Sequence, residues 1–168
     1  LKEAFGFDND ESLKDSLLKK NVTLNKKSIK FNVLCMNLKG GAGKSTNANL
    51  LASFFNNSTL IEIDKINKSA LGINSKDYYD SIQIDFKNEQ SDDFITFENM
   101  IFEDGVKIID VGAVKLEVFH SAMVTNKLYE DVDFIIIPAM DGLDDFIVAD
   151  KFLNTLKSLN ILEPYKIL

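Results

Sequence analysis

Short apolar runs alternate with helical stretches along the chain from residue 29 onward. The apolar runs are rich in Ile and Val, show little polar alternation, and span residues 29–37, 59–64, 106–110, 132–139 and 165–168. Such runs are typical of parallel strands that are covered on both faces. The helical stretches lie near residues 44–55, 114–130 and 142–160. Because strands and helices alternate, the sequence predicts a doubly wound α/β fold, with a mostly parallel sheet and helices on both faces.

The clearest helical stripe lies in the last of these stretches. There the i, i+3, i+4, i+7 spacing of a core-facing side is met by Ala149, Phe152, Leu153 and Leu156. The pattern is less clear between residues 65 and 104. Residues 81–86 alternate like an edge strand, whereas residues 92–102 fit either a helix or a strand.

Residues 1–28 differ from the rest, and we expect an N-terminal helix and linker ahead of a single domain over 29–168. Residues 8–10 offer helix caps before an amphipathic stretch at 11–20, in which acids come first and lysines last. The polar residues that follow are typical of a linker. The sequence leaves open whether this arm is a surface appendage or docks a partner.

Composition excludes several classes of protein. The chain has 168 residues, of which 45% are hydrophobic and 27% charged, as in an ordinary soluble domain. No run approaches the ~20 apolar residues of a membrane-spanning helix, and the lone Cys35 favours a reducing, cytoplasmic setting. The net charge of −7 argues against binding of nucleic acid through the overall charge of the chain. All 19 basic residues are lysines, so the chain supplies no arginine finger.

The most informative segment is LKGGAGKST at residues 38–46, between an apolar strand and a helix. A phosphate chain needs many donors that converge from one side, and glycines let successive backbone N–H groups turn inward. The helix beginning near Lys44 adds its positive end, the lysine reaches the β and γ phosphates, and Ser45 can hold Mg²⁺. The nucleotide-binding residues predicted here are Gly40, Gly41, Ala42, Gly43, Lys44, Ser45 and Thr46.

The segment KGGAGKST resembles the deviant Walker A motif of the ParA/MinD-type P-loop ATPases. The resemblance implies a P-loop NTPase fold of the SIMIBI class that binds ATP or ADP with Mg²⁺. Leu38 stands where the generic P-loop has glycine, a position that varies in this family. Lys39 matches the signature lysine, which family members insert into the partner subunit's nucleotide site within an ATP-sandwich homodimer.

The resemblance extends to two downstream segments, 58–67 and 106–119, and to Pro138 at the end of the next strand. Glu62 and Asp64 match the two acids of the family's Asp-x-Asp-Pro-Gln, and the second helps position the attacking water. Lys and Ile replace the usual Pro-Gln. Asp110 matches the Walker B acid, which helps hold Mg²⁺ together with Ser45. The following Val-Gly-Ala is similar to plasmid-stability members of the family.

The resemblance implies a slow ATPase that acts as a dimerisation switch in plasmid or chromosome partition, with a partner protein stimulating hydrolysis. Its catalytic residues are Lys39, Lys44 and Asp64. Family members continue past a strand like 165–168, so we expect a C-terminal part to be absent. DNA binding is possible in the family but is not supported by this acidic chain, and no membrane contact is expected.

Other functions stay open. The same switch could serve conjugation, protein positioning or metal-cluster delivery; the chain could be an ATP-dependent small-molecule ligase; or it could bind ATP without hydrolysing it. Three further features are expected to be structural. His120 is interpreted as a packed side chain, Cys35 as a small core residue, and the acids at 144–145 as a solvated face or a helix start.

Overall fold

The computed structural model describes residues 29–55, 57–63, 79–85, 87–88 and 91–161. Its strands are β1 (Lys30–Cys35), β2 (Thr59–Ile63), β3 (Asp80–Gln83), β4 (Gly105–Val111) and β5 (Phe134–Ile136). Its helices are α2 (Lys44–Phe54), α3 (Asp92–Phe102), α4 (Leu116–Thr125), the 3-10 helix η4 (Leu128–Asp131) and α5 (Leu143–Ser158). The predicted N-terminal helix and the predicted strand at 165–168 lie outside the described residues.

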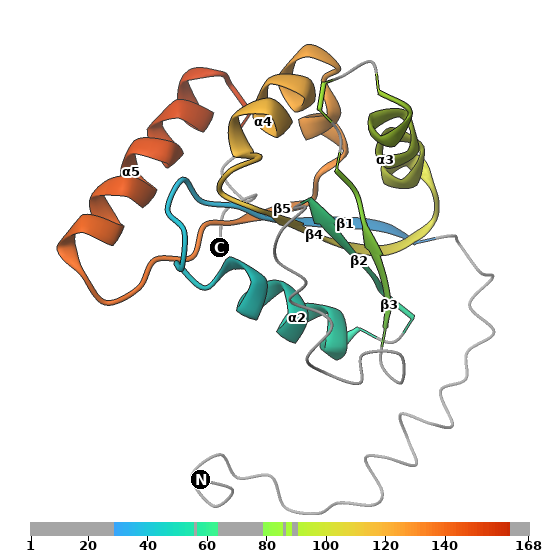
Figure 1. Cartoon of the computed structure of the whole chain (residues 1–168), viewed down its shortest axis with the longest axis horizontal. Coiled ribbons are helices and arrows are strands. Elements are labelled where there is room, and N and C mark those ends of the chain that lie inside the picture. The colour runs from blue at the N-terminus through green and yellow to red at the C-terminus, as the bar shows by residue number, and fades with distance from the viewer. Residues whose placement is uncertain (1–28, 56, 64–78, 86, 89–90, 162–168) are drawn as a thin grey trace, which may run out of the picture.

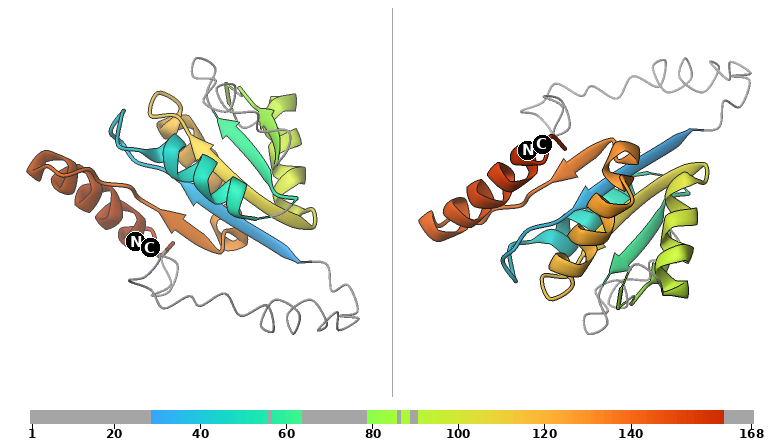
Figure 2. Two further views of the ribbon diagram at one scale, coloured as in Figure 1. Left: turned by 90° about the horizontal axis from the view of Figure 1, so that it is seen from below. Right: turned by 90° about the horizontal axis from the view of Figure 1, so that it is seen from above.

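The five described strands form one parallel sheet in the order β3-β2-β4-β1-β5. Helix α2 lies on one face of this sheet, and α3 and α4 lie on the other (Figure 1). Helix α5 lies at the β5 side of the sheet, away from α3 (Figure 2). The predicted doubly wound α/β fold is therefore confirmed.

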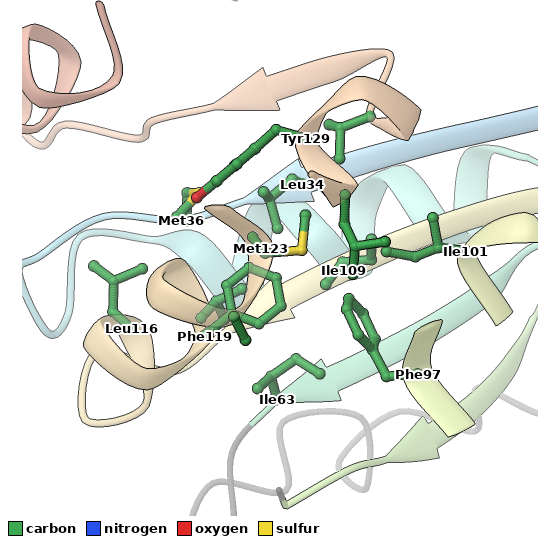
Figure 3. Packing of buried hydrophobic residues seen from close by; sticks show 14 of the residues in the cluster. Leu34, Met36, Ile63, Phe97, Ile101, Ile109, Leu116, Phe119, Met123 and Tyr129 are labelled. Carbon is green, nitrogen blue, oxygen red and sulfur yellow. The ribbon is translucent and has the colours of Figure 1, made fainter. Parts of the chain in front are cut away.

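Each central strand buries both of its faces, which explains why the apolar runs hardly alternate. On β1, Leu34 packs into the larger core with α3, α4 and α5, whereas Val33 and Cys35 pack beneath α2. In the larger core, the rings of Phe97 and Phe119 meet edge to face with centroids 5.5 Å apart (Figure 3). The predicted stripe of α5 faces this core through its buried Phe152 and Leu156, while Ala149 and Leu153 are partly buried.

The structure settles the segments that the sequence left ambiguous. Residues 92–102 form a helix, because Ser91 caps its N-terminus by accepting from the Phe94 N–H and the apolar side chains follow helical spacing. The predicted edge strand is β3, which does lie at the edge of the sheet.

The predicted strand at 132–139 is wrong in extent, since β5 has three residues. The predicted helix at 114–130 is also too long: α4 ends at Thr125, and left-handed Lys127 precedes η4.

The order of the strands places a topological switch point between β1 and β4. These strands are neighbours, yet the chain leaves β1 through α2 on one face and leaves β4 through α4 on the other. In open α/β sheets, ligands bind at such a switch point, outside the carboxyl ends of the strands. Among the residues that the structure describes, no helix has the length and apolar character needed to cross a membrane.

Candidate functional site

The loop between β1 and α2 has the backbone that its glycines predict. Gly41 and Gly43 have φ values of 74° and 85°, a left-handed conformation that side chains with a Cβ rarely adopt. Gly43 is also the N-cap of α2, and it brings no side-chain cap to the helix. Its carbonyl accepts from the Asn47 backbone N–H at 3.0 Å and from Asn47 Nδ2 at 2.9 Å. The first turn of α2 is thus bonded to its own N-cap residue. The N-terminus of a helix carries backbone N–H groups and a partial positive charge, which favour an anion.

A cavity of about 320 Å³ opens at this helix end. Its walls come from the loop after β1, the first turn of α2 and the loop after β4, and they comprise Gly40, Gly41, Gly43, Lys44, Ser45, Thr46, Gly112, Ala113 and Val114. The cavity therefore lies at the switch point of the sheet. Six of the seven nucleotide-binding residues predicted from the sequence line it, and Ala42 is instead buried. Backbone N–H groups and a helix N-terminus around one cavity favour a phosphate-bearing anion.

Lys44 brings a positive charge to the cavity wall. Its side chain is largely buried, and Nζ donates a hydrogen bond of 2.8 Å to the backbone carbonyl of Lys39. This bond folds the lysine back along the loop, so the ammonium lies beside the glycines. An incoming phosphate can compete for the same donor, because a charge-assisted bond to phosphate is stronger than one to a neutral carbonyl.

Lys39 points to a different partner. Its ammonium forms an ion pair with the buried carboxylate of Asp145 in the first turn of α5. The Lys39 backbone N–H donates to Asn37 Oδ1 at 3.1 Å, and Asn37 Nδ2 donates to the Pro138 carbonyl at 2.6 Å. The loop is thereby tied to the segment between β5 and α5. The interpretation of residues 144–145 as a helix start is confirmed, but a solvated face is wrong for Asp145.

Asp110 lies on β4 with its side chain buried. Across the sheet it is in register with Cys35 of β1 on one side and Glu62 of β2 on the other. Partners in register on parallel strands share a face, and Cys35 places this row beneath α2. Burial, helped by the charge of Asp110, raises the pKa of the Cys35 thiol to about 12. Cys35 is therefore a neutral core residue, as the sequence predicted.

The donor set is consistent with Mg²⁺ at the cavity. Asp110 precedes the cavity-lining Gly112 by two positions, and Ser45, a hydroxyl-bearing residue in the first turn of α2, lines the same cavity. Mg²⁺ prefers oxygen ligands and keeps several waters, so one carboxylate, one hydroxyl and substrate phosphates are sufficient. Within the described part of the chain, no three His, Cys, Asp or Glu side chains gather around a shared metal position.

The predicted water-positioning Asp64 lies outside the described residues, as do Lys65 and Ile66. Its neighbour Glu62 is described and is buried beside Asp110. The structure thus brings the loop, Lys44, Ser45 and Asp110 to one end of the sheet.

Four residues contact the loop after β1 or the first turn of α2, directly or through one another, and were not predicted from the sequence to do so. They are Asn37, Asn49, Tyr79 and Asp145. Asn37 ends the first apolar run, and a polar residue at that point is the one signal that could have indicated a loop contact. Asp145 lies 106 positions from Lys39, and no local pattern reports such a pair.

His120 packs between helices as predicted. Its Nδ1 lies 2.6 Å from the Tyr129 hydroxyl, and its ring meets the rings of Tyr129 and Phe152 edge to face. Burial lowers the pKa of His120 and raises that of Tyr129. This cluster joins α4, η4 and α5, and it is separate from the cavity.

No protein-family model matches this chain, and no curated protein matches it significantly.

Proposed function

We propose that this chain is a Mg²⁺-dependent, slowly hydrolysing ATPase that uses ATP to drive its dimerisation, as in the ParA/MinD-type ATPases that its loop resembles. The observation that carries the proposal is the cavity at the switch point of the sheet. There, glycines 40, 41 and 43 and the N-terminus of α2 converge with the buried Lys44. This combination supports binding of a polyphosphate, because such a ligand needs several N–H donors and a cation on one side.

Each residue has a distinct task in the proposed reaction. Backbone N–H groups of the loop hold phosphate oxygens, and Lys44 exchanges its bond to the Lys39 carbonyl for one to the β and γ phosphates. Ser45 and Asp110 would hold Mg²⁺, which would supply positive charge to offset that of the phosphates. Asp64 orients the attacking water.

A second cation is needed near the γ phosphate, where negative charge spreads in the transition state. The chain has no arginine, since all of its 19 basic residues are lysines. Lys39 is the proposed cation, and it acts from the partner subunit of a homodimer. In the single chain its ammonium is held by Asp145 rather than by the cavity, which is consistent with a role outside its own site.

The cellular role proposed is plasmid or chromosome partition in the cytoplasm, with a partner protein that stimulates hydrolysis. The resemblance alone supports this role. A switch for another cargo, a ligase and a non-hydrolysing ATP-binding module are the alternatives. Turnover separates the last of these from the rest, and ATP-dependent dimerisation separates the switches from the ligase.

Calorimetry tests the nucleotide site. The wild-type chain should bind ADP and ATP in the presence of Mg²⁺, and Lys44→Ala should weaken binding about 10- to 100-fold, the value of one charge-assisted hydrogen bond. Lys157→Ala is the matched control, because this lysine is exposed in the last turn of α5. Equal affinities of the wild-type and Lys44→Ala proteins would contradict the proposal.

Turnover tests the assignment of the switch acid. Asp64→Ala should retain ATP binding and slow hydrolysis, because a water-positioning group acts mainly in the transition state. Hydrolysis at the wild-type rate would remove Asp64 from the mechanism while leaving the nucleotide site intact.

A further inference from the structure

A buried polar pair lies beneath α2, next to the proposed Mg²⁺ ligands. The Tyr79 hydroxyl donates a hydrogen bond of 2.6 Å to Asn49 Oδ1, and Asn49 Nδ2 donates one of 2.6 Å to the backbone carbonyl of Ser45. Both side chains are buried, with 4% of Tyr79 and 9% of Asn49 exposed. Two hydrogen bonds thus connect the residue before β3 with the first turn of α2.

The surroundings of this pair are apolar and would accept apolar side chains. Tyr79 belongs to the core cluster under α2, together with Val33, Ala48, Leu60 and Ile108. Asn inside a helix is less favourable than Leu or Ala, and burying a hydroxyl and an amide requires that both be hydrogen-bonded. Replacing both partners of such a pair by apolar groups is often neutral for stability. The pair is therefore better explained by the geometry that it imposes than by the stability that it adds.

The hydrogen bonds of the pair fix the position of the Ser45 backbone. Its carbonyl lies one helical turn before Asn49, so the side-chain amide bonds to the backbone of a residue that lines the cavity. Burial, and then the charge of Glu62, raises the pKa of the Tyr79 hydroxyl, which therefore stays protonated and donates to Asn49 Oδ1. That donation directs Asn49 Nδ2 to Ser45. Glu62 is in turn the register partner of Asp110.

We propose that Tyr79 and Asn49 are positioning residues for Mg²⁺, which hold the first turn of α2 so that the Ser45 hydroxyl and the Asp110 carboxylate meet the same ion. This inference rests on the proposed function, since it presupposes that Mg²⁺ and a nucleotide bind at the cavity. If Tyr79 and Asn49 have this role, they determine how much Mg²⁺ strengthens nucleotide binding. They do not affect the contacts between the loop and the phosphates.

The test compares ADP affinity by calorimetry in excess Mg²⁺ and in excess EDTA. Tyr79→Phe removes one oxygen atom and keeps the ring in the core. We expect its ADP affinity in EDTA to equal that of the wild type, and the strengthening by Mg²⁺ to fall about three- to tenfold, the value of one buried hydrogen bond. The double variant Tyr79→Phe/Asn49→Leu should fold and show a loss at least as large.

Tyr129→Phe is the matched control, because Tyr129 is an equally buried tyrosine whose hydroxyl bonds to His120 in the other core. It should leave the Mg²⁺ effect unchanged. An unchanged Mg²⁺ effect in both Tyr79 variants, or an equal loss in Tyr129→Phe, would overturn the inference and leave the nucleotide site standing. Failure of the wild-type chain to bind ADP under either condition would overturn the proposed function and this inference together.

Discussion

Lys39 and Asp145, 106 positions apart in the sequence, form an ion pair between the loop after β1 and the first turn of α5. The carboxylate is nearly inaccessible to solvent, whereas 43% of the lysine side chain remains exposed. An acid in the first turn of a helix is favoured by the helix dipole, and here it also fixes a lysine beside the candidate site. Any role of Lys39 in another subunit therefore requires that this pair open.

Removing the Lys39 side chain should separate binding from dimerisation. We expect Lys39→Ala to bind nucleotide as a monomer and to lose both ATP-dependent dimerisation and hydrolysis, because the second cation is gone. Light scattering of ATP-loaded Asp64→Ala, with and without Lys39→Ala, measures the dimer fraction. Equal dimer fractions, together with normal turnover of the single Lys39→Ala protein, would favour the ligase or the monomeric ATP-binding module.

Removing the charge of Asp145 should have the opposite effect on the dimer. Asp145→Asn frees the lysine without changing the size of the side chain, so less ATP should be needed to reach half dimerisation. Because the lysine is partly exposed, we expect a shift of about two- to fivefold. Asp144→Asn, one position earlier and exposed, makes the same charge change and should produce no shift. A requirement for more ATP in Asp145→Asn would show that the pair supports the dimer.

The fold was predictable because each central strand is long, apolar and bounded by helical spacing. The pattern did not predict where the elements at the edges of the fold begin and end. The apolar run over 132–139 suggested a long strand, yet β5 pairs along Phe134–Ile136 before the chain departs toward α5. Residues 92–102 carry apolar positions that suit both periods, and the capping contact of Ser91 favours the helix.

In the candidate site, too, local features could be predicted from the sequence, whereas contacts between distant segments could not. The loop over 38–46 was predictable because glycines, a lysine and a hydroxyl at fixed spacing are local features. The contacts of Lys39 with Asp145 and of Tyr79 with Asn49 were not, because a lysine on a loop or a tyrosine before a strand gives no sign of its partner. Hydrogen bonds between distant segments depend on the packing of whole elements.

Asn32 should be a main determinant of stability at the opposite end of the sheet. It is buried in β1, and its Nδ2 donates to the carbonyls of Ile101 at 3.0 Å and of Asp131 at 2.8 Å. Asn32→Ala leaves both carbonyls without this donor, so we expect the free energy of unfolding to fall by about 2–3 kcal/mol in urea titrations. Asn99→Ala, on the exposed face of α3, should change it by less than about 0.5 kcal/mol. Similar losses in both variants would show that the buried amide adds nothing.

His120 should make the stability of the chain depend on pH in a defined direction. Burial between α4, η4 and α5 lowers its pKa below the ordinary value of 6.5. As pH falls below that value, His120 gains a proton in the unfolded chain before it does so in the folded one. The unfolded state then binds more protons, so stability that is complete above 6.5 declines as pH falls through the lowered pKa of the folded state.

The difference between wild type and His120→Gln isolates this effect from the carboxylates, which titrate in both proteins. Glutamine keeps a polar group near the Tyr129 hydroxyl and has no charge to gain. Urea unfolding at about pH 7.5 and about pH 5.5 should show a larger loss of stability on acidification in the wild type than in the variant. Parallel losses would mean that His120 titrates alike in the folded and unfolded chains. A smaller loss in the wild type would mean that the folded chain stabilises the charged ring, which would contradict a lowered pKa of His120.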